Sequence, residues 1–258
     1  MQKKIRHFVI TRFLCSDFGY GDKIKSPEFI AEGIRLLNKF FVPSLLNQTN
    51  HNFEVIFAIH NDIPYERIEG LSRIATGDIK THIVRWGSID DFIYEQTADE
   101  DIVITTRMDY DDLVFSDAVS VIQNLATKAS NLEYLWHGYT TGCTLIEDDE
   151  KHELHKMVKK YDGDGAWSIF QSLVMFKRKK TSIYCLGNHT EIKRTIRFKN
   201  IGFTYKEESF ICDHRDMAYV WIRHADTGSH TCKHDTEQLV NIGEEDFCNR
   251  FGVSLSTI

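Results

Sequence analysis

The chain has 258 residues, of which 42% are hydrophobic and 27% charged, and its formal net charge is −7. This composition is typical of a globular protein with enough apolar residues for a sizeable core. The acidic balance argues against non-specific nucleic-acid binding, because such binding needs a basic face that displaces counterions from phosphates. We therefore expect no nucleic-acid partner.

Hydropathy and cysteine usage indicate where in the cell the protein is located. The apolar run Phe8–Ile10 is too short for a signal peptide or a membrane span, and no other run approaches spanning length. The six cysteines, at positions 15, 143, 185, 212, 232 and 248, form no CxxC pair and are typical of reduced intracellular thiols. We expect a cytoplasmic protein that is at most peripheral to the inner face of a membrane.

The first half of the chain alternates predicted strands and helices. Strands are expected at residues 7–11, 52–59, 81–85 and 102–105, and helices at 26–41, 43–48, 65–75, 89–96 and 117–126. Ser26-Pro27-Glu28 is a typical helix start, and Pro43 is expected to break or kink the helix that follows. This alternation predicts an α/β fold with a mostly parallel sheet and right-handed crossovers.

The second half follows a different pattern. Two antiparallel hairpin strands are expected within 134–146, a solvated helix or arm at 148–160, strands at 173–178 and 219–223, and a closing helix or helix pair at 237–251. The basic run Lys177–Lys180 is interpreted as a solvated turn, with an anionic acceptor or membrane surface as the alternative. No linker or repeat divides the chain, so we expect one domain over residues 1–258.

Three acids follow the apolar strand that begins at Ile102: Asp109, Asp111 and Asp112. Crowded carboxylates repel one another, so this cluster implies a compensating cation, and hard oxygen ligands favour Mg²⁺ or Mn²⁺. The alternative is a solvated turn in which an aspartate, or Ser116, caps the next helix.

Several segments carry a family resemblance: His7–Arg12, Phe41–Thr49, Asn52–Glu54, Thr105–Leu113 and Trp221–His224. On these residues the chain resembles nucleotide-sugar glycosyltransferases of the GT-A type, and most closely the rhamnosyltransferase-like family. The resemblance implies a GT-A-like sheet with a smaller antiparallel extension. It also implies a nucleotide-binding half over 1–127, an acceptor-side half over 128–258, and a hexosyltransferase that uses Mg²⁺ or Mn²⁺.

The resemblance assigns residue roles. Metal ligands are expected at Asp109, Asp111, Asp112 and His224. Contacts to the nucleotide sugar are expected at Thr11, Arg12, Asp62, Arg107 and Asp109. A different interpretation of the late residues is structural zinc, with ligands among Cys212, His214, His230, Cys232 and His234, but their spacing fits no common zinc motif.

An inverting transferase also needs a general base, which deprotonates the acceptor hydroxyl. Asp164 and Glu191 are the candidates, and the sequence favours a solvated carboxylate over a general base for each of them. Trp167 is expected either to stack on an acceptor sugar or to be half buried in the core.

The expected partners are a nucleotide-diphosphate sugar donor, rhamnose being one sugar that the resemblance implies, and a saccharide or lipid-linked acceptor in surface polysaccharide synthesis. Two other functions stay open. The same acids would suit a nucleotidyltransferase or a metal-dependent phosphoesterase, or they would only shape a turn in a non-catalytic binding module.

Overall fold

The structure is a computed structural model. It describes residues 4–14, 21–74, 76–97, 102–129, 131–139, 141–147, 152–158, 170–186, 203, 209–223, 237–239, 242–254 and 256. Among these residues, none of the helices has both the length and the apolar character needed to cross a bilayer.

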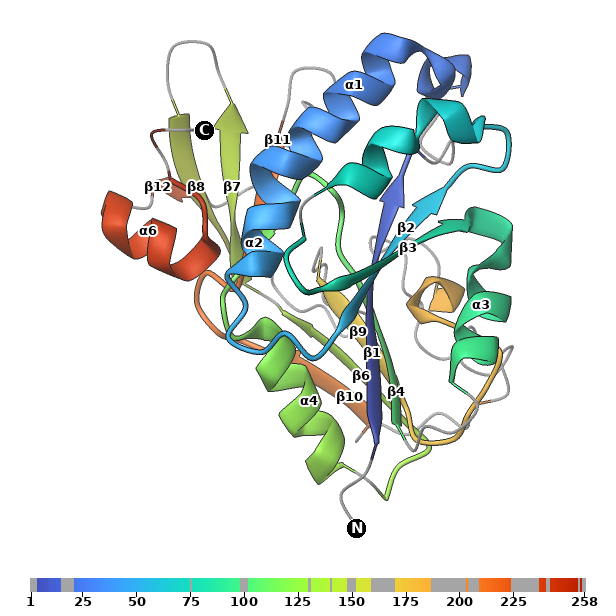
Figure 1. Ribbon diagram of the computed structural model, residues 1–258. Helices are drawn as coiled ribbons and strands as arrows, with labels where there is room; N and C mark the ends of the chain where they lie inside the picture. Colours follow the sequence, from blue (N-terminus) through green and yellow to red (C-terminus); the bar gives the residue numbers. More distant parts are fainter. Residues whose placement is uncertain are drawn as a thin grey trace.

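A seven-stranded sheet forms the centre of the molecule (Figure 1). Its strands are β1 (Ile5–Phe13), β2 (Glu54–Ile59), β3 (Lys80–Arg85), β4 (Ile102–Arg107), β6 (Tyr134–Tyr139), β9 (Gln171–Met175) and β10 (Phe210–Asp213). Their order is β10-β6-β9-β4-β1-β2-β3, and only β9 runs antiparallel to its neighbours. The expected mostly parallel α/β sheet is confirmed.

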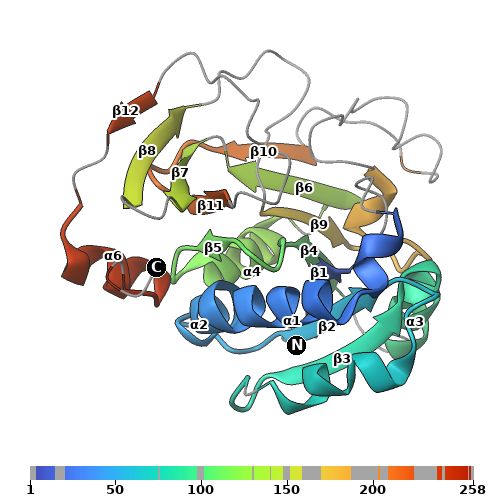
Figure 2. The ribbon, with the colours of Figure 1, turned by 90° about the horizontal axis from the view of Figure 1, so that it is seen from above.

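Helices cover both faces of this sheet (Figures 1 and 2). On one face lie α1 (Pro27–Leu36), α2 (Val42–Leu46) and α4 (Ala118–Lys128), and on the other lie α3 (Ile89–Gln96) and the short 3₁₀ helix η7 (Ile183–Leu186). Both faces are apolar because the central strands are buried on both sides, as in other parallel sheets.

The start of α1 follows the sequence prediction. The hydroxyl of Ser26 accepts a hydrogen bond from the backbone N–H of Phe29 at 3.1 Å. Pro43 does not end the helix, which continues through a π-helical turn at Leu37–Phe41 into α2. Because proline clashes with the carbonyl of the preceding turn, a widened turn lets the helix continue.

A five-stranded sheet forms the smaller extension (Figure 2). Its strands are β5 (Leu113–Val114), β7 (Thr141–Glu147), β8 (His152–Val158), β11 (Tyr219–Arg223) and β12 (Glu237–Leu239), in the order β12-β8-β7-β11-β5. All neighbouring pairs are antiparallel except β7 and β11. Leu145 and Ile222 belong to the same apolar core as Val9 of β1, so the two sheets share one core.

Three expectations for the second half are wrong. Residues 134–146 do not form a hairpin, because β6 joins the large sheet and β7 the small one. The charged segment 148–160 contains β8, whose pairing with β7 and β12 outweighs its weak strand propensity. The closing helix expected over 237–251 is present as α6 (Glu244–Phe251), but Glu237–Leu239, at the start of that range, form β12 in place of a helix.

Two smaller corrections concern the first half. Residues 65–75 form the short 3₁₀ helices Tyr65–Arg67 and Glu69–Arg73 in place of an α-helix. The residue that precedes α4 is Asp117, and neither it nor Ser116 caps the helix through its side chain, because the Asp117 carboxylate accepts from the Thr49 hydroxyl at 2.7 Å.

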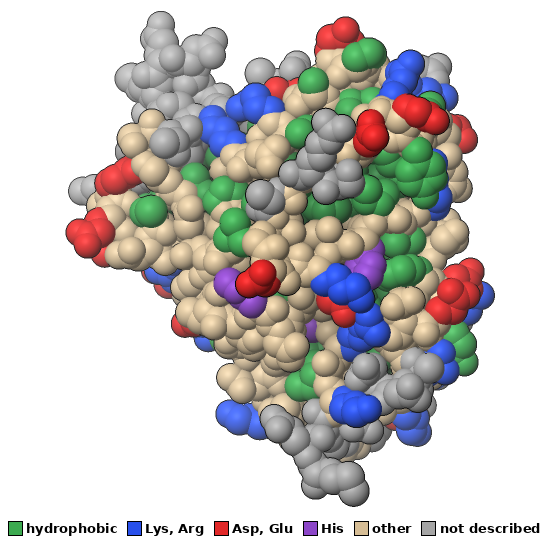
Figure 3. Space-filling view, in the orientation of Figure 1, with side chains coloured by type: hydrophobic (Ala, Val, Ile, Leu, Met, Phe, Trp, Pro, Cys, Tyr) green, Lys and Arg blue, Asp and Glu red, His purple; other side chains and the backbone are tan. Residues whose placement is uncertain are grey.

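Charged side chains of both signs are interspersed over the face shown in Figure 3. Within the basic run, Lys177 donates to Glu133 at 2.7 Å, Lys180 is paired with Asp91, and the Arg178 guanidinium lies over the Tyr94 ring. These side chains are exposed and bound to the chain's own groups, as in a solvated turn.

Candidate functional site

The carboxyl ends of β1 and β4 lie side by side at one edge of the large sheet. Ile10 pairs with Arg107, so β1 continues for three residues beyond the end of β4. The side chains of a strand alternate between its faces, which puts Arg12 on the face of Ile10. Arg12 and Arg107 both lie over the ring of Tyr184 in η7, at 5.5 and 5.6 Å from its centroid.

Arg107 is a buried cation at this edge. Its side chain is 1% exposed, and Nη2 donates to both carboxylate oxygens of Asp109 at 3.3 and 3.4 Å. The guanidinium atoms Nε and Nη1 are buried and donate no hydrogen bond to any described residue. A buried guanidinium with unused donors is costly unless an anion completes its contacts.

Asp109 lies between the two arginines. Its Oδ1 is 3.7 Å from Nη2 of Arg12, in addition to its bonds from Arg107. The carboxylate thus bridges the ends of β1 and β4. The geometry brings together three of the residues that the sequence assigned to the nucleotide sugar.

The other two acids, Asp111 and Asp112, have raised pKa values. Burial, and after it the charge of Asp109, raises the pKa of Asp111 to about 7. Burial, and after it the charges of Asp111 and Asp109, raises the pKa of Asp112 well above its ordinary value. Asp112 also accepts a hydrogen bond from the backbone N–H of Ile222 at 3.1 Å. Both carboxyl groups are therefore in surroundings that would favour a nearby cation.

The acids fit a divalent cation that is held partly by substrate. Among the described residues no group of three His, Cys, Asp or Glu side chains forms a ready ligand set. Mg²⁺, however, is commonly bound by one or two carboxylates together with substrate phosphates. Asp111 suits that role. Asp109 already accepts from Arg107, and Asp112 accepts from Ile222, but each carboxylate oxygen has a second lone pair that can bind a cation.

Two further predicted contacts lie apart from the arginines. Thr11 is fully buried, and strand alternation puts its side chain on the face of Val9, opposite to Arg12. Asp62 follows β2 and is exposed, with its carboxylate 3.9 Å from Nδ1 of His60 and 4.0 Å from Nζ of Lys25. Thr11 is therefore part of the buried face of β1, and Asp62 lies on the surface beyond the end of β2.

Asp164, Trp167, Glu191 and His224 lie outside the described residues. The same holds for His230, Cys232 and His234 of the zinc interpretation, whereas Cys212 and His214 lie in and after β10.

Sequence reasoning missed residues that only the fold brings to this edge. Tyr184 lies under both arginines, donates its hydroxyl to the Ile10 carbonyl at 3.1 Å, and contacts the Trp86 ring edge to face at 4.8 Å. Tyr184 is 77 residues from Arg107 in sequence, and no motif marks it. Asp213 ends β10 at the same edge of the sheet and lies 3.8 Å from Nε2 of the buried His137, with the pKa of Asp213 lowered chiefly by that histidine.

Comparisons with known proteins give one family. A family model described as "Putative rhamnosyl transferase" matches residues 23–216, which is most of the chain. The match includes Asp62, Arg107 and the three acids, and excludes Thr11, Arg12 and His224. No curated protein matches the chain.

Solved structures of S. aureus TarS are similar at low identity. The structure of TarS 1-349 has 8% identity and a TM-score of 0.40, with 85% of this chain and 60% of that chain covered. TarS 1-349 in complex with UDP-GlcNAc has 12% identity and a TM-score of 0.37, with 86% and 59% covered. A longer TarS structure has 12% identity and a TM-score of 0.33, with 85% and 37% covered. The chain spans less than two thirds of the length of each.

Proposed function

We propose that the chain, which belongs to the family described as "Putative rhamnosyl transferase", is a glycosyltransferase that transfers a sugar, with rhamnose as the candidate, from a nucleotide-diphosphate donor. The acceptor is the hydroxyl of a saccharide or of a lipid-linked saccharide, in surface polysaccharide synthesis at the cytoplasmic side of the membrane. The donor phosphates bind at the carboxyl edge of β1 and β4.

The observation that carries this proposal is the state of Arg107. Its guanidinium is buried, and two of its nitrogens donate no hydrogen bond to any described residue. The planar fork of arginine matches the oxygens of a phosphate, and charge-assisted bonds of this kind are the strong ones. A diphosphate at this edge would complete the contacts of Arg107 and meet the positive charge of Arg12.

The acids supply the metal side of the same site. We assign Asp111 and Asp109 as the side chains that would hold Mg²⁺ or Mn²⁺, with Asp112 and His224 as further candidate ligands. When bound, such an ion offsets the charge that develops on the leaving diphosphate. Arg107 and Arg12 orient the phosphates, and Tyr184 keeps both guanidinium groups in place from below.

Residues on the acceptor side remain part of the proposal. Asp164 or Glu191 would act as the general base, and Trp167 would stack on the acceptor sugar. Thr11 and Asp62 would lie beside the nucleoside of the donor.

Calorimetric titration of UDP, GDP and dTDP tests the donor site, with each nucleotide measured in Mn²⁺ and in chelator. We expect one nucleotide to bind in a metal-dependent way. Arg107→Lys keeps the charge but removes the fork, and the loss of one or two charge-assisted bonds of about 1.5–3 kcal/mol each should weaken binding at least tenfold. Arg35→Lys, on the exposed side of α1 where Arg35 bonds Glu32, is the matched control.

The titration also separates the rival functions. If no nucleotide binds the folded protein, the proposal is wrong and the acids only shape a turn. If binding is unchanged in Arg107→Lys, the phosphates lie elsewhere.

A further inference from the structure

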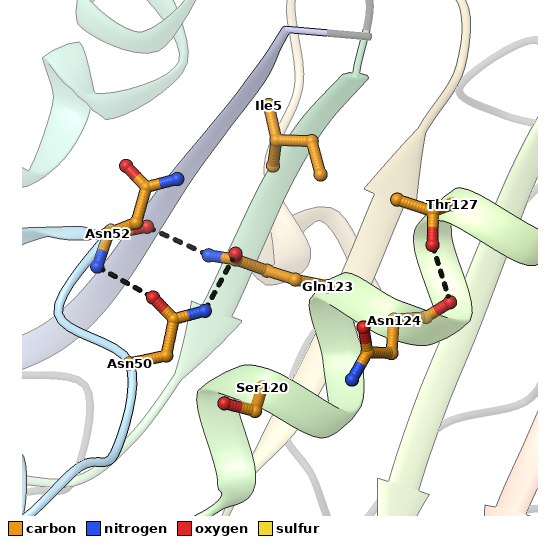
Figure 4. Close-up of a pocket in the computed structure, with 7 residues that line it drawn as sticks. All are labelled: Ile5, Asn50, Asn52, Ser120, Gln123, Asn124 and Thr127. Atoms are coloured by element: carbon orange, nitrogen blue, oxygen red, sulfur yellow. Dashed lines mark hydrogen bonds between the residues drawn. The ribbon is translucent and has the colours of Figure 1, made fainter. Parts of the chain in front are cut away.

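A polar pocket lies at the opposite edge of the large sheet. It has a volume of about 260 Å³ and is lined by Ile5, Asn50, Asn52, Ser120, Gln123, Asn124 and Thr127 (Figure 4). Ile5 begins β1, Asn50 and Asn52 precede β2, and the remaining residues lie on α4. The pocket therefore lies between α4 and the amino ends of two central strands.

The pocket is remote from the donor edge. Ile5 and Arg12 are at opposite ends of β1, and at ~3.3 Å per residue a strand of this length separates them by ~23 Å. A small ligand that fills the pocket is far too short to reach Arg12 and Arg107 at the other edge. The pocket is thus a separate site.

Hydrogen bonds fix the floor of the pocket. The Gln123 side chain accepts from Nδ2 of Asn50 at 3.0 Å and donates to the Asn52 carbonyl at 2.8 Å, and the Asn50 carboxamide oxygen accepts from the Asn52 backbone N–H at 2.9 Å (Figure 4). Behind it, Gln123 Nε2 lies 3.4 Å from Nδ1 of buried His7. These bonds orient the floor before any ligand binds, which lowers the entropy cost of binding.

Other polar groups of the pocket keep unused hydrogen-bonding capacity. The side-chain amides of Asn52 and Asn124 are exposed and bond no described residue, and Thr127 uses its proton for the Asn124 carbonyl at 2.8 Å while its oxygen lone pairs remain. Each amide offers two donors and an acceptor. The Ser120 hydroxyl lies 3.3 Å from the Thr49 hydroxyl and keeps lone pairs that can accept a further bond. Together these groups offer donors and acceptors within one small hollow.

The chemistry of the lining selects the ligand. None of the seven lining residues is charged, and the surface over α4 in Figure 3 is mostly free of charged side chains. A phosphate or nucleotide would find no cation here, and an apolar ligand would leave the amides unpaired. The volume is below the range of about 300–1,000 Å³ typical of sites for drug-sized ligands. The lining suits a small, neutral, hydroxyl-rich molecule.

We propose that this pocket is a secondary saccharide site that binds one neutral sugar ring, such as a unit of a glycan chain, at a distance from the donor edge. Sugar hydroxyls both donate and accept, and so match the mixed amide and hydroxyl lining. Without an aromatic platform and with few hydrogen bonds, the dissociation constant is expected on the order of 1 mM. Binding here needs neither the metal nor the arginines.

Saturation-transfer-difference NMR on the full chain tests the site, with L-rhamnose, D-glucose, N-acetylglucosamine and isomaltotriose as probes at up to about 20 mM, well above the expected dissociation constant. Asn52→Ala combined with Asn124→Ala removes the two open amides, and Ser120→Phe fills the pocket. Asn38→Ala is the control, because Asn38 is an exposed asparagine that donates to the Ile34 carbonyl outside the pocket. Thermal unfolding checks that each variant is folded.

We expect at least one probe to bind the original protein and the control, with affinity lost about tenfold or more in both pocket variants and unchanged by UDP with Mn²⁺. The proposal is overturned if no probe binds, if the folded pocket variants bind as well as the control, or if UDP competes with the sugar. A failed donor titration with successful sugar binding would refute the donor site alone.

Discussion

The carboxylate of Asp112 accepts a hydrogen bond from the backbone N–H of Ile222 at 3.1 Å, across 110 residues of the chain. Asp112 directly precedes β5, whose Leu113 and Val114 pair with Val220 and Tyr219 of β11. The side chain of Asp112 therefore adds one hydrogen bond to β11 beyond the backbone pairing of β5 with β11. One acid of the cluster has a structural role, and it connects the carboxyl edge of β1 and β4 to the strand that leads to His224.

This relationship predicts different effects for two substitutions at one position. Asp112→Ala leaves the buried Ile222 N–H without an acceptor, which should lower the free energy of unfolding by about 1–3 kcal/mol. Asp112→Asn keeps an acceptor oxygen and removes a potential charge, so it should cost much less. Urea unfolding of the two variants in chelator measures the difference, and equal losses would show that the bond to Ile222 contributes nothing.

The raised pKa of Asp111 predicts an unusual pH dependence. The ordinary value is 3.8 and the value in the folded protein is about 7, so between them the folded state binds more protons than the unfolded state. In this window the free energy of unfolding should fall as the pH rises, by up to about 1.4 kcal/mol per unit of pKa difference. Asp111→Asn should remove this loss, whereas Asp78→Asn, on an exposed turn, should not.

Unfolding of each variant in denaturant at pH 4.5 and pH 7.5, with chelator present, gives the comparison. Added Mg²⁺ or Mn²⁺ should reduce the fall in the original protein, because a cation favours the ionised carboxylate. A fall that is the same in Asp111→Asn would contradict the assignment.

His7 predicts a dependence of the opposite sign. Burial lowers its pKa from 6.5 to about 3, and its Nε2 bonds Thr106 Oγ1 at 2.7 Å. Between these values the unfolded state binds more protons, so this histidine should lower the free energy of unfolding as the pH falls below about 6.5. Gln at this position can donate to Thr106 but does not titrate. His7→Gln should therefore lose less stability than the original protein between pH 7 and pH 5, as measured by chemical unfolding.

Gly142 should resist substitution for steric reasons. A Cβ added there would overlap with the ring of Tyr219, a fully buried residue of β11, which lies between β5 and β7. Gly142→Ala should lower the free energy of unfolding by about 1–3 kcal/mol through overpacking. Gly87→Ala is the control, because its Cβ would only meet Asn61 at 3.4 Å. A thermal scan of both variants checks this, and similar melting temperatures would contradict the close approach.

Local sequence signals were sufficient for much of the large sheet. The runs in β1, β2 and β4 are apolar because both faces are buried, and Ser26-Pro27 marks a helix start through capping alone. The charged segment around β8 could not be predicted, because its strand is fixed by pairing with β7 and β12. The pairing of β6 could not be predicted either, because its partner β9 lies 32 residues further along the chain.

The candidate site divides in the same way. Arg107 and the three acids lie within six consecutive positions of the sequence, so a strand followed by carboxylates was sufficient to locate them. Tyr184 could not be found, since its place under Arg12 and Arg107 depends on where η7 packs. The link from Asp112 to Ile222 is equally a product of tertiary structure.

The most direct measurement is an assay of products from a panel of nucleotide sugars, dTDP-rhamnose among them, with Mn²⁺ or Mg²⁺ and a saccharide acceptor. Transfer should release a free nucleoside diphosphate from one donor and should stop in chelator. The rate of transfer should fall at least tenfold in Arg107→Lys, because lysine lacks the planar guanidinium fork. Release of a nucleoside monophosphate or pyrophosphate from the donor, or diphosphate release that is unchanged in Arg107→Lys, would contradict the account.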